Sequence, residues 1–446
     1  MRGIEAALTV LTSESVSRGK FSSEALRILA DRENMKSPDI TLASSLIYIV
    51  MRRKELWEKI SSDYLKSKEK LPPAVNMAVL MGTGGLLELR RFSGGVLVNG
   101  IIEYLRRNKS TAKYAGLVNA VLHKVIENGA GTLEKFKSSP SIEGRAMYAG
   151  IPVWTLPAWS RTWTRQELNA IFDMAGLPSY SALRVSPGKT DELTRLLDEL
   201  DKNGVRYHKS DISPAIRLSE SAMPSKIPGF DEGLFTVQAE GSILTASLAG
   251  KFYKSGMILD MCSGRGVKSA QILQECPQSH IECWEISEAR SNSARHELER
   301  LGVISRAAFK TGNALSLEPD DSPEFVVLDA PCSGSGTWNR KPESKWRLTW
   351  DKFDSIVAAQ KKLLERAVSL CKSGGYVLYI TCSLLKQENE NIIAEILSSH
   401  SECAEVSGLI EWRGEVFRKG KPYGIYILPG NSWLDGFYCS LILKRG

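Results

Sequence analysis

Two cysteines in the second half of the chain follow apolar runs that are predicted to be buried strands. Cys332 stands in the segment Asp329-Ala-Pro-Cys-Ser-Gly-Ser-Gly after FVVL, and Cys382 stands in Thr-Cys-Ser after YVLYI. A buried structural thiol is the ordinary role of a single cysteine, and we expect that role for Cys371 and Cys439. Two thiols at the carboxyl ends of neighbouring parallel strands instead indicate a reactive pair.

Methylation of a pyrimidine at C5 is a reaction that uses two thiols beside a nucleoside cofactor. C5 becomes nucleophilic only after a thiolate adds to C6, and a second group must then remove the C5 proton so that the first thiol can leave. An acid near N3 of the base would favour this addition, because it neutralises negative charge as the charge forms. Asp329, at the end of its strand, is suited to that role.

A glycine-containing turn follows the apolar run MILDMC, and it predicts a cofactor site. Backbone N–H groups of such a turn, with the N-terminus of the next helix, can bind a nucleotide. The next strand, IECWEI, contains Glu285, whose carboxylate can accept hydrogen bonds from both ribose hydroxyls. Each feature alone is weak, but together they favour a nucleoside cofactor. The turn residues expected to contact it are Cys262, Ser263, Gly264, Arg265, Gly266, Val267 and Lys268.

Strands and helices alternate through the region that carries these residues. MILDMC precedes a helix from Lys268, IECWEI precedes SEARSNSARHELERLG, FVVLDA precedes a long helix, and YVLYITCS precedes ENENIIAEILSSH. Repeated βαβ units predict a doubly wound α/β fold with a parallel sheet and helices on both faces. Ligands bind at the carboxyl edge of such sheets, which is where the predicted site residues lie.

The N-terminal part of the chain is predicted to be an all-α bundle. Ile4, Ala7, Leu8 and Leu11 have the spacing of one helix face, and similar stripes recur along this part. Short links rich in Pro or Gly, such as residues 72–73 and 82–85, are expected to join these helices. The expected domains are a helical bundle over 1–137, a Ser/Pro/Gly-rich linker over 138–151, a small α+β unit over 152–230 and a catalytic domain over 231–446.

Composition limits the class of protein. The chain has 446 residues, of which 43% are hydrophobic, which is enough for two or three packed domains. Lys and Arg number 58 against 51 Asp and Glu, giving a net charge of +7. Residues 1–150 hold 23 basic and 15 acidic residues, a net charge of +8. Composition alone does not decide whether this basic excess is ordinary solvated surface or a patch that faces phosphates.

Location and metal content follow from the same residues. Arg2 and Glu5 place charge in the first turn, unlike a signal peptide, and no apolar run approaches the length of a membrane span. We therefore expect a soluble, cytoplasmic protein with no membrane partner. The eight cysteines form no C-x-x-C pair and no cluster at zinc spacing, so free thiols and no metal are expected.

The two cysteine motifs resemble those of the bacterial small-subunit rRNA cytosine-C5 methyltransferases of the RsmB (Fmu/Sun) type, and the resemblance covers nearly the whole length. It implies that Cys382 attacks the base and that Cys332 assists product release. It also implies a Rossmann-like catalytic domain that binds S-adenosylmethionine, and 16S ribosomal RNA, naked or within an assembling small subunit, as substrate. VQAEGS (237–242) and DGFYCSLILKR (435–445) extend the match, and GLVNAVLHKV (116–125) resembles a NusB-like RNA-binding domain.

The cofactor site departs from the pattern of that family. The family turn has Pro-Gly-Gly-Lys where this chain has Arg265-Gly-Val-Lys268, and valine cannot adopt the conformations reserved for glycine. Asn313 stands where the family has an aspartate that faces the adenine amino group. An amide carbonyl can still accept that hydrogen bond, so we expect an altered but working site.

Tryptophans and cations interleave directly after the Pro-Cys motif, a composition that suits a flipped base and its neighbouring phosphates. Trp338, Trp346 and Trp350 alternate there with the predicted RNA contacts Arg340, Lys341, Lys345 and Arg347. Packing of at least one tryptophan against the body of the protein is the competing expectation. For the whole chain, the alternatives are a noncatalytic RNA-binding assembly factor with a degenerate methyltransferase domain and a nicotinamide-dependent oxidoreductase on the same fold.

Overall fold

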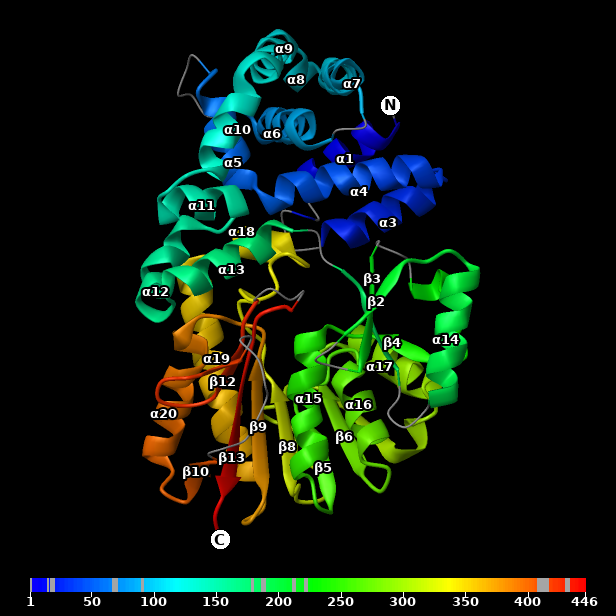
Figure 1. Cartoon of the computed structure of the whole chain (residues 1–446), viewed down its shortest axis with the longest axis vertical. Coiled ribbons are helices and arrows are strands. Elements are labelled where there is room, and N and C mark those ends of the chain that lie inside the picture. The colour runs from blue at the N-terminus through cyan, green and yellow to red at the C-terminus, as the bar shows by residue number, and fades with distance from the viewer. Residues whose placement is uncertain are drawn as a thin grey trace. The chain divides into compact units, whose positions relative to one another are not determined.

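The chain divides into two compact units. The first comprises Met1–Ser160, Ala175–Leu177 and Trp338–Leu348, and the second comprises the remaining segments. The computed structural model describes residues 2–13, 16, 21–65, 71–89, 92–177, 180–185, 190–210, 214–219, 224–406, 417–429 and 434–446. Figure 1 shows helices throughout the first unit, and sheets flanked by helices in the second. The expected sequence of a helical domain followed by an α/β domain is therefore confirmed.

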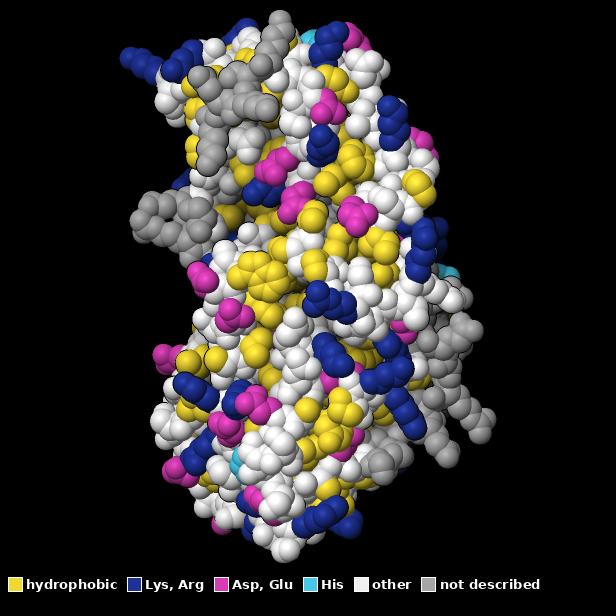
Figure 2. Space-filling model, turned by 90° about the vertical axis from the view of Figure 1, so that its left-hand side faces the viewer, with side chains coloured by type: hydrophobic (Ala, Val, Ile, Leu, Met, Phe, Trp, Pro, Cys, Tyr) yellow, Lys and Arg dark blue, Asp and Glu magenta, His cyan; other side chains and the backbone are white. Residues whose placement is uncertain are grey.

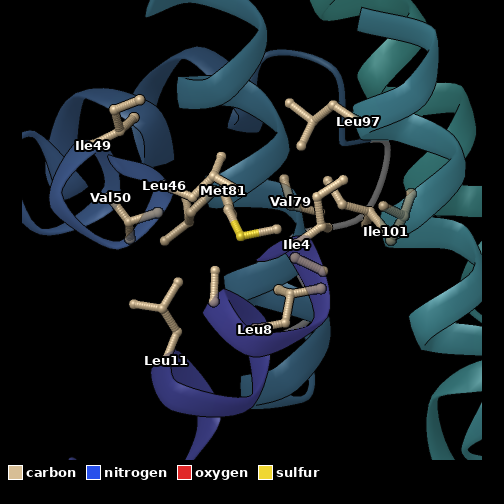
Figure 3. Close-up of a cluster of buried hydrophobic side chains, with 14 of the residues drawn as sticks. Ile4, Leu8, Leu11, Leu46, Ile49, Val50, Val79, Met81, Leu97 and Ile101 are labelled. Carbon is tan, nitrogen blue, oxygen red and sulfur yellow. The ribbon is translucent and has the colours of Figure 1, made fainter. Parts of the chain in front are cut away.

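The first unit is a bundle whose core comes from the predicted stripes. Its helices are α1 (Arg2–Thr12), α3 (Ser22–Arg32), α4 (Ser37–Arg52), α5 (Lys54–Ser62), α6 (Pro73–Glu88), α7 (Gly94–Arg107), α8 (Lys109–Ala112), α9 (Ala115–Lys124), α10 (Ala130–Lys137), α11 (Ile142–Ala149), α12 (Leu156–Thr162) and α18 (Pro342–Arg347). Ile4 and Leu8 of α1 are fully buried with Leu46 of α4, Val79 of α6 and Ile101 of α7. Figure 3 shows these side chains converging between the helices.

The glycines at 82–85 do not form a link. Helix α6 runs through them, and neighbouring side chains lie too close to admit larger residues at these positions. A Cβ atom on Gly82 would lie 2.5 Å from a methyl carbon of Leu122, and one on Gly84 would lie 2.6 Å from Ile49. Glycine costs a helix about 1 kcal/mol relative to alanine, but here it admits close packing. The expected break at this point is wrong.

The segment 138–151, expected to be a linker, contains helix α11 and belongs to the first unit. Ser141 caps this helix, because its Oγ accepts a hydrogen bond of 3.0 Å from the N–H of Gly144. Gly150 ends it with a positive φ of 72°. Ser141 and Gly150 are therefore helix caps, and the compact unit that contains this segment extends to Ser160.

A small antiparallel sheet lies in the second unit. Its strands are β1 (Ala182–Val185), β2 (Tyr207–Lys209), β3 (Ala215–Leu218) and β4 (Phe235–Val237), in the order β2-β3-β1-β4, and α13 (Arg165–Gly176) and α14 (Thr190–Lys202) precede β1 and β2. Leu183, Leu196 and Ile216 join the two kinds of element in one buried cluster. This mixture of helix and strand is what the sequence predicted for the region.

The large sheet carries the predicted site. Its strands are β5 (Met257–Asp260), β6 (His280–Glu285), β7 (Ala307–Thr311), β8 (Phe325–Asp329), β9 (Tyr376–Thr381), β10 (Cys403–Glu405), β11 (Phe417–Lys419), β12 (Ile425–Ile427) and β13 (Phe437–Lys444). The helices between and before them are α15 (Glu240–Phe252), α16 (Val267–Glu275), α17 (Glu288–Arg300), α19 (Trp350–Leu370) and α20 (Glu390–Ser399). The strand order is β11-β12-β13-β9-β8-β5-β6-β7, and β10 pairs with β13.

The direction of the chain reverses between β5 and β8. From β5 the chain moves outward to β6 and β7, and it then returns to build β8 and β9 on the other side of β5. These five strands are parallel, whereas β13 pairs antiparallel with β9. Right-handed crossovers in opposite directions put helices on opposite faces, as in a doubly wound sheet. The carboxyl ends of β5 and β8 therefore flank the switch point, where such sheets bind ligands.

Candidate active site at the carboxyl edge of the sheet

The turn after β5 retains glycine at the positions that require it. Gly264 and Gly266 have φ angles of 58° and 74°. Among non-glycine residues in the described ranges, Asn34 alone has a positive φ, so Arg265 and Val267 do not need glycine-only backbone. Val267 is the first residue of helix α16. The departure from the family sequence therefore leaves the backbone of the turn unstrained.

The same turn has room for a ligand. A Cβ atom built on Gly264 would meet no heavy atom within 4 Å. Beneath the turn, Asp260 is buried and its Oδ2 accepts a hydrogen bond of 2.6 Å from Oγ of Ser269. Burial raises the pKa of Asp260 to about 6. Burial also raises the pKa of the neighbouring Cys262 thiol, which makes that thiol a poor nucleophile.

Glu285 and Asn313 lie side by side at the ends of β6 and β7. The N–H of Gly312 donates a hydrogen bond of 3.0 Å to the carbonyl of Glu285 and so fixes their spacing. Oε1 of Glu285 accepts the N–H of Ser287 at 2.8 Å and lies 2.6 Å from Nη2 of Arg290. Asn313 is exposed, and its Oδ1 accepts the N–H of Leu315 at 3.1 Å. Both polar groups are thus held by short local contacts at the edge of the turn.

An exposed apolar residue, which the sequence did not single out, lies beside this pair. Ile286 follows Glu285 directly, and 67% of its surface is exposed to solvent. The cost of exposing a large aliphatic side chain would fall if a flat apolar ligand covered it. Little in the sequence singled out Ile286, because an isoleucine at the end of IECWEI fits the predicted strand without a role in binding.

Asp329 forms an ion pair with the last residue of the turn. Nζ of Lys268 lies 2.6 Å from Oδ2 of Asp329, and the lysine side chain is 11% exposed. The pair joins α16 to the end of β8 across the switch point. Lys268, which was predicted to contact the cofactor, therefore also pairs with the expected acid, a contact that the sequence did not predict.

The two motif cysteines meet. Sγ of Cys332 lies 3.3 Å from Sγ of Cys382, and both residues are half-buried. Strands β8 and β9 are parallel neighbours with Asp329 opposite Ile380, and the N–H of Gly336 donates to the carbonyl of Cys382 at 3.0 Å. Adjacent parallel strands thus bring together two residues that are 50 positions apart, as the sequence predicted.

The paired thiols differ in acidity. The hydrogen bond from Cys332 lowers the pKa of Cys382, and the nearby hydroxyl of Thr337 and ammonium of Lys268 lower it further. The pKa of Cys332 is raised well above that of an ordinary thiol by the same hydrogen bond and by burial. Since the thiolate is the nucleophile, Cys382 is the more reactive member.

Five further cysteines lie in the interior of the protein. Cys276, Cys283, Cys371, Cys403 and Cys439 are buried in the described structure. Burial raises the pKa of Cys276 to about 11 and that of Cys371 and Cys439 to about 12. The predicted structural role of Cys371 and Cys439 is consistent with this burial.

The aromatic and basic segment after the Pro-Cys motif belongs largely to the first unit, where it packs. Trp338 is buried, with its ring centroid 5.9 Å from that of Trp159. Lys345 is 1% exposed, and its Nζ donates to the carbonyl of Arg52 at 2.7 Å. Burial lowers the pKa of this lysine well below its usual range. Its predicted contact with RNA is wrong, because its ammonium group faces the protein interior.

The other members of that segment differ in exposure. Nη2 of Arg347 lies 2.9 Å from Oε2 of Glu343, so its charge is paired within the unit. Arg340 is half-buried and Lys341 is exposed. Trp350, at the start of α19 in the second unit, is 54% exposed. Of the four predicted RNA contacts, Lys341 has the most accessible side chain.

Comparisons with known proteins agree with the sequence motifs. A family model described as 16S rRNA methyltransferase RsmB/F matches residues 250–443, and one described as NusB family matches 5–127. The chain is 27% identical over 412 residues to ribosomal RNA small subunit methyltransferase B of Xanthomonas campestris. This match covers 91% of this chain and 89% of that protein. It is 32% identical over 261 residues to the protein of that name from Pectobacterium atrosepticum, and this match covers 56% of each chain.

Solved structures share the fold. The crystal structure of PH0851 matches 99% of this chain and 98% of its own, with a TM-score of 0.79 and 22% identity. A methyltransferase homolog protein from Pyrococcus horikoshii matches 69% of this chain and 99% of its own, with a TM-score of 0.55 and 23% identity. At these identities the likeness establishes the fold alone.

Proposed function

We propose that this chain, which belongs to the RsmB/F family of 16S rRNA methyltransferases, methylates C5 of a cytosine in small-subunit ribosomal RNA through a covalent adduct with Cys382. The observation that carries the proposal is the contact of 3.3 Å between Sγ of Cys332 and Sγ of Cys382. One thiol of this pair is activated and the other is held protonated, which matches the needs of a two-step covalent reaction.

Cys382 starts the reaction. Its thiolate adds to C6 of the cytosine, so that electron density moves to C5 and N3 and C5 becomes nucleophilic. Its lowered pKa favours the thiolate at neutral pH. Asp329 and Lys268 form a charged pair at the same edge and can stabilise or protonate N3 as negative charge develops there.

Cys332 ends the reaction. After C5 has gained a methyl group, its proton must leave before the bond from C6 to Sγ of Cys382 can break. Bonding of Cys382 to C6 consumes the thiolate that held Cys332 protonated, so Cys332 can lose its own proton to solvent and then, as a thiolate, accept the C5 proton. The electron pair of the broken C5–H bond then reforms the double bond, and Cys382 leaves as thiolate.

The cofactor is S-adenosylmethionine, which supplies an electrophilic methyl group when bound. The residues present fit such a ligand, because Gly264 leaves open space before the N-terminus of α16. Backbone N–H groups of the turn would hold polar atoms of the ligand. Glu285 would bind the ribose, Asn313 would face the adenine amino group, and Ile286 would cover one face of the ring.

The substrate contacts extend beyond the catalytic sheet. The helical unit matches the NusB family and carries an excess of positive charge, and we assign phosphate contacts to its exposed cations. Figure 2 shows Lys and Arg side chains interspersed with acidic and apolar ones on one face of the molecule. Action on ribosomal RNA, naked or in an assembling subunit, would place the protein in the cytoplasm. In the described ranges, no helix is long and apolar enough to cross a membrane.

Bisulfite sequencing of ribosomal RNA from a deletion strain tests the reaction. One cytosine of 16S rRNA should lose its methyl group in that strain, and the wild-type chain should restore it while Cys382→Ala should not. A noncatalytic assembly factor, the competing function, predicts instead that subunit maturation fails in the deletion strain and that Cys382→Ala restores it fully. An unchanged methylation pattern in the deletion strain would contradict the proposal.

A further inference from the structure

Glu388 is a buried acid beside the active site that the proposed mechanism does not use. It is fully buried at the end of a short 3-10 turn (Lys386–Glu388) after β9. Its Oε1 accepts the N–H of Ser333 at 2.7 Å and Nε2 of Gln360 at 3.2 Å. Its Oε2 accepts a hydrogen bond of 2.5 Å from the hydroxyl of Ser333, and a second one from the hydroxyl of Ser383. One carboxylate thus joins the residues that directly follow Cys332 and Cys382.

Further hydrogen bonds tie the same two loops together. Oγ of Ser335, on the Pro-Cys loop, accepts the N–H of Leu384 at 2.8 Å and lies 3.1 Å from Oγ of Ser383. Gln360, fully buried on α19, also donates to the carbonyl of Pro331 at 2.9 Å. Glu388 is the central acceptor of this network, and its removal would leave several buried donors unsatisfied.

The charge of Glu388 also acts on the thiols. Burial raises the pKa of Glu388, and hydrogen bonds from Ser333 and Ser383 oppose that rise. The charge of Glu388 in turn raises the pKa of Cys332. An anion at this position therefore disfavours a second anion on Cys332 and leaves the negative charge of the pair on Cys382.

We propose that Glu388 is a positioning residue that fixes the separation of the Pro-Cys and Thr-Cys loops and keeps Cys332 the protonated member of the pair. The consequence for catalysis rests on the proposed function, whereas the consequence for the reactivity of the thiols does not. The two can therefore be tested separately.

Replacement of Glu388 by glutamine tests the proposal with little change in shape. The amide keeps one acceptor but turns an N–H₂ group toward a cluster of donors. Glu390→Gln is the matched control, because Glu390 is 3% exposed and accepts hydrogen bonds from Tyr426 at 3.2 Å and from the N–H of Lys421. Those partners lie outside the two cysteine loops.

Alkylation of the full-length protein by iodoacetamide over a pH series, read by peptide mass spectrometry, reports each thiol without substrate. In the wild type and in Glu390→Gln, Cys382 should react faster than Cys332. In Glu388→Gln the ratio of the two rates should fall by roughly tenfold, the change that one pKa unit produces. Methyl transfer should slow through kcat while KM for RNA stays constant.

Each outcome decides the question. An alkylation ratio equal to that of Glu390→Gln would overturn the proposal, whether or not turnover falls. A changed ratio in a protein that fails to methylate cytosine even as wild type would retain the positioning role and refute the proposed function. If Glu388→Gln does not fold, Ser383→Ala removes one arm of the network, and it should lower the ratio in the same direction. An unchanged ratio in that variant would also overturn the proposal.

Discussion

Nζ of Lys268 lies 2.6 Å from Oδ2 of Asp329, so the first turn of α16 is joined to the end of β8 where the strand order reverses. Both groups act on the nucleophile we propose. The ammonium group of Lys268 lowers the pKa of Cys382, and the carboxylate of Asp329 raises it. The pair therefore places a positive and a negative charge beside the thiol whose ionisation starts the proposed reaction.

The two charges should have opposite effects on Cys382 when each is removed. Lys268→Met removes the positive charge, so the pKa of Cys382 should rise and its alkylation should need a higher pH. Asp329→Asn removes the negative charge, so the pKa should fall and alkylation should begin at lower pH. Lys254→Met, an exposed lysine before β5, should leave the profile unchanged. Shifts of equal sign in the two variants would contradict these opposite effects.

The sequence predicted the sheet and the meeting of the cysteines, because both depend on strong local patterns. Apolar runs of five or six residues between helices predict a parallel sheet, and neighbouring strands place Cys332 and Cys382 at one edge. The glycine pattern after β5 was informative for the same reason. Its conformation depends on Gly264 and Gly266, which the chain retains.

The predictions that failed have one physical cause. Tertiary contacts decide which polar residues and glycines are buried, and a local sequence pattern does not show them. Gly82 lies within a helix, where Leu122 packs so closely that a Cβ atom would not fit, and no local pattern shows that contact. Lys345 was expected to face RNA, but its ammonium group caps a carbonyl of Arg52, 293 residues earlier in the chain. Glu388 was not predicted, because acidic residues before a helix are usually exposed.

Removal of the Glu285 carboxylate should weaken cofactor binding. The ribose hydroxyls would lose a charged acceptor, which is worth about 1.5–3 kcal/mol, so the dissociation constant of S-adenosylmethionine should rise about 10- to 100-fold in Glu285→Ala. Calorimetric titration measures this. Glu288→Ala, an exposed acid in the first turn of α17, is the control and should keep the wild-type affinity. Equal affinities in the two variants would show that the ribose binds elsewhere.

The contacts of Glu343 should contribute to the stability of the helical unit. This residue is 7% exposed. Its carboxylate accepts hydrogen bonds from the N–H of Ser22 at 3.0 Å, from the hydroxyl of Ser22 and from the guanidinium group of Arg347. Glu343→Gln should lower the free energy of unfolding by about 1–3 kcal/mol, because buried donors lose their charged acceptor. Urea unfolding with hydrogen exchange on α3 and α18 measures the loss. Glu33→Gln, in an exposed pair with Arg32, should change it by less than about 0.5 kcal/mol.

Phosphate contacts of the helical unit are best tested by point substitution. Deletion of residues 1–137 would strip Glu343 and Lys345 of their buried partners, so loss of binding would not isolate charge. Arg106, Lys109 and Lys113 are exposed at the end of α7 and in and after α8. Their joint replacement by alanine should weaken RNA binding and reduce the slope of log affinity against log salt by about 0.7–0.9 for each lost contact. An unchanged slope would mean that these charges are only solvated.

The order of chemical steps gives the two thiols separate signatures. Cys332→Ala removes the group that takes the C5 proton in the proposed mechanism, but it leaves the proposed nucleophile, Cys382, in place. The C6 adduct should still form and accept a methyl group, yet elimination should stall, so a covalent complex of protein and RNA should accumulate on a denaturing gel. Cys403→Ala, a buried thiol of β10, should show no such band.

The structure also predicts that formation of this covalent complex in Cys332→Ala depends on pH. Cys332 lowers the pKa of Cys382 through the hydrogen bond between them, so Cys332→Ala should raise the pKa of the remaining thiol. The thiolate fraction at neutral pH then falls, and the covalent band should form more slowly near pH 7 and faster as the pH rises. Replacing Cys382 as well should abolish the band at every pH, because no nucleophile is left. A trapped complex with Cys382→Ala and none with Cys332→Ala would reverse the two roles, since the thiol that bonds to C6 must be present in any complex that survives denaturation.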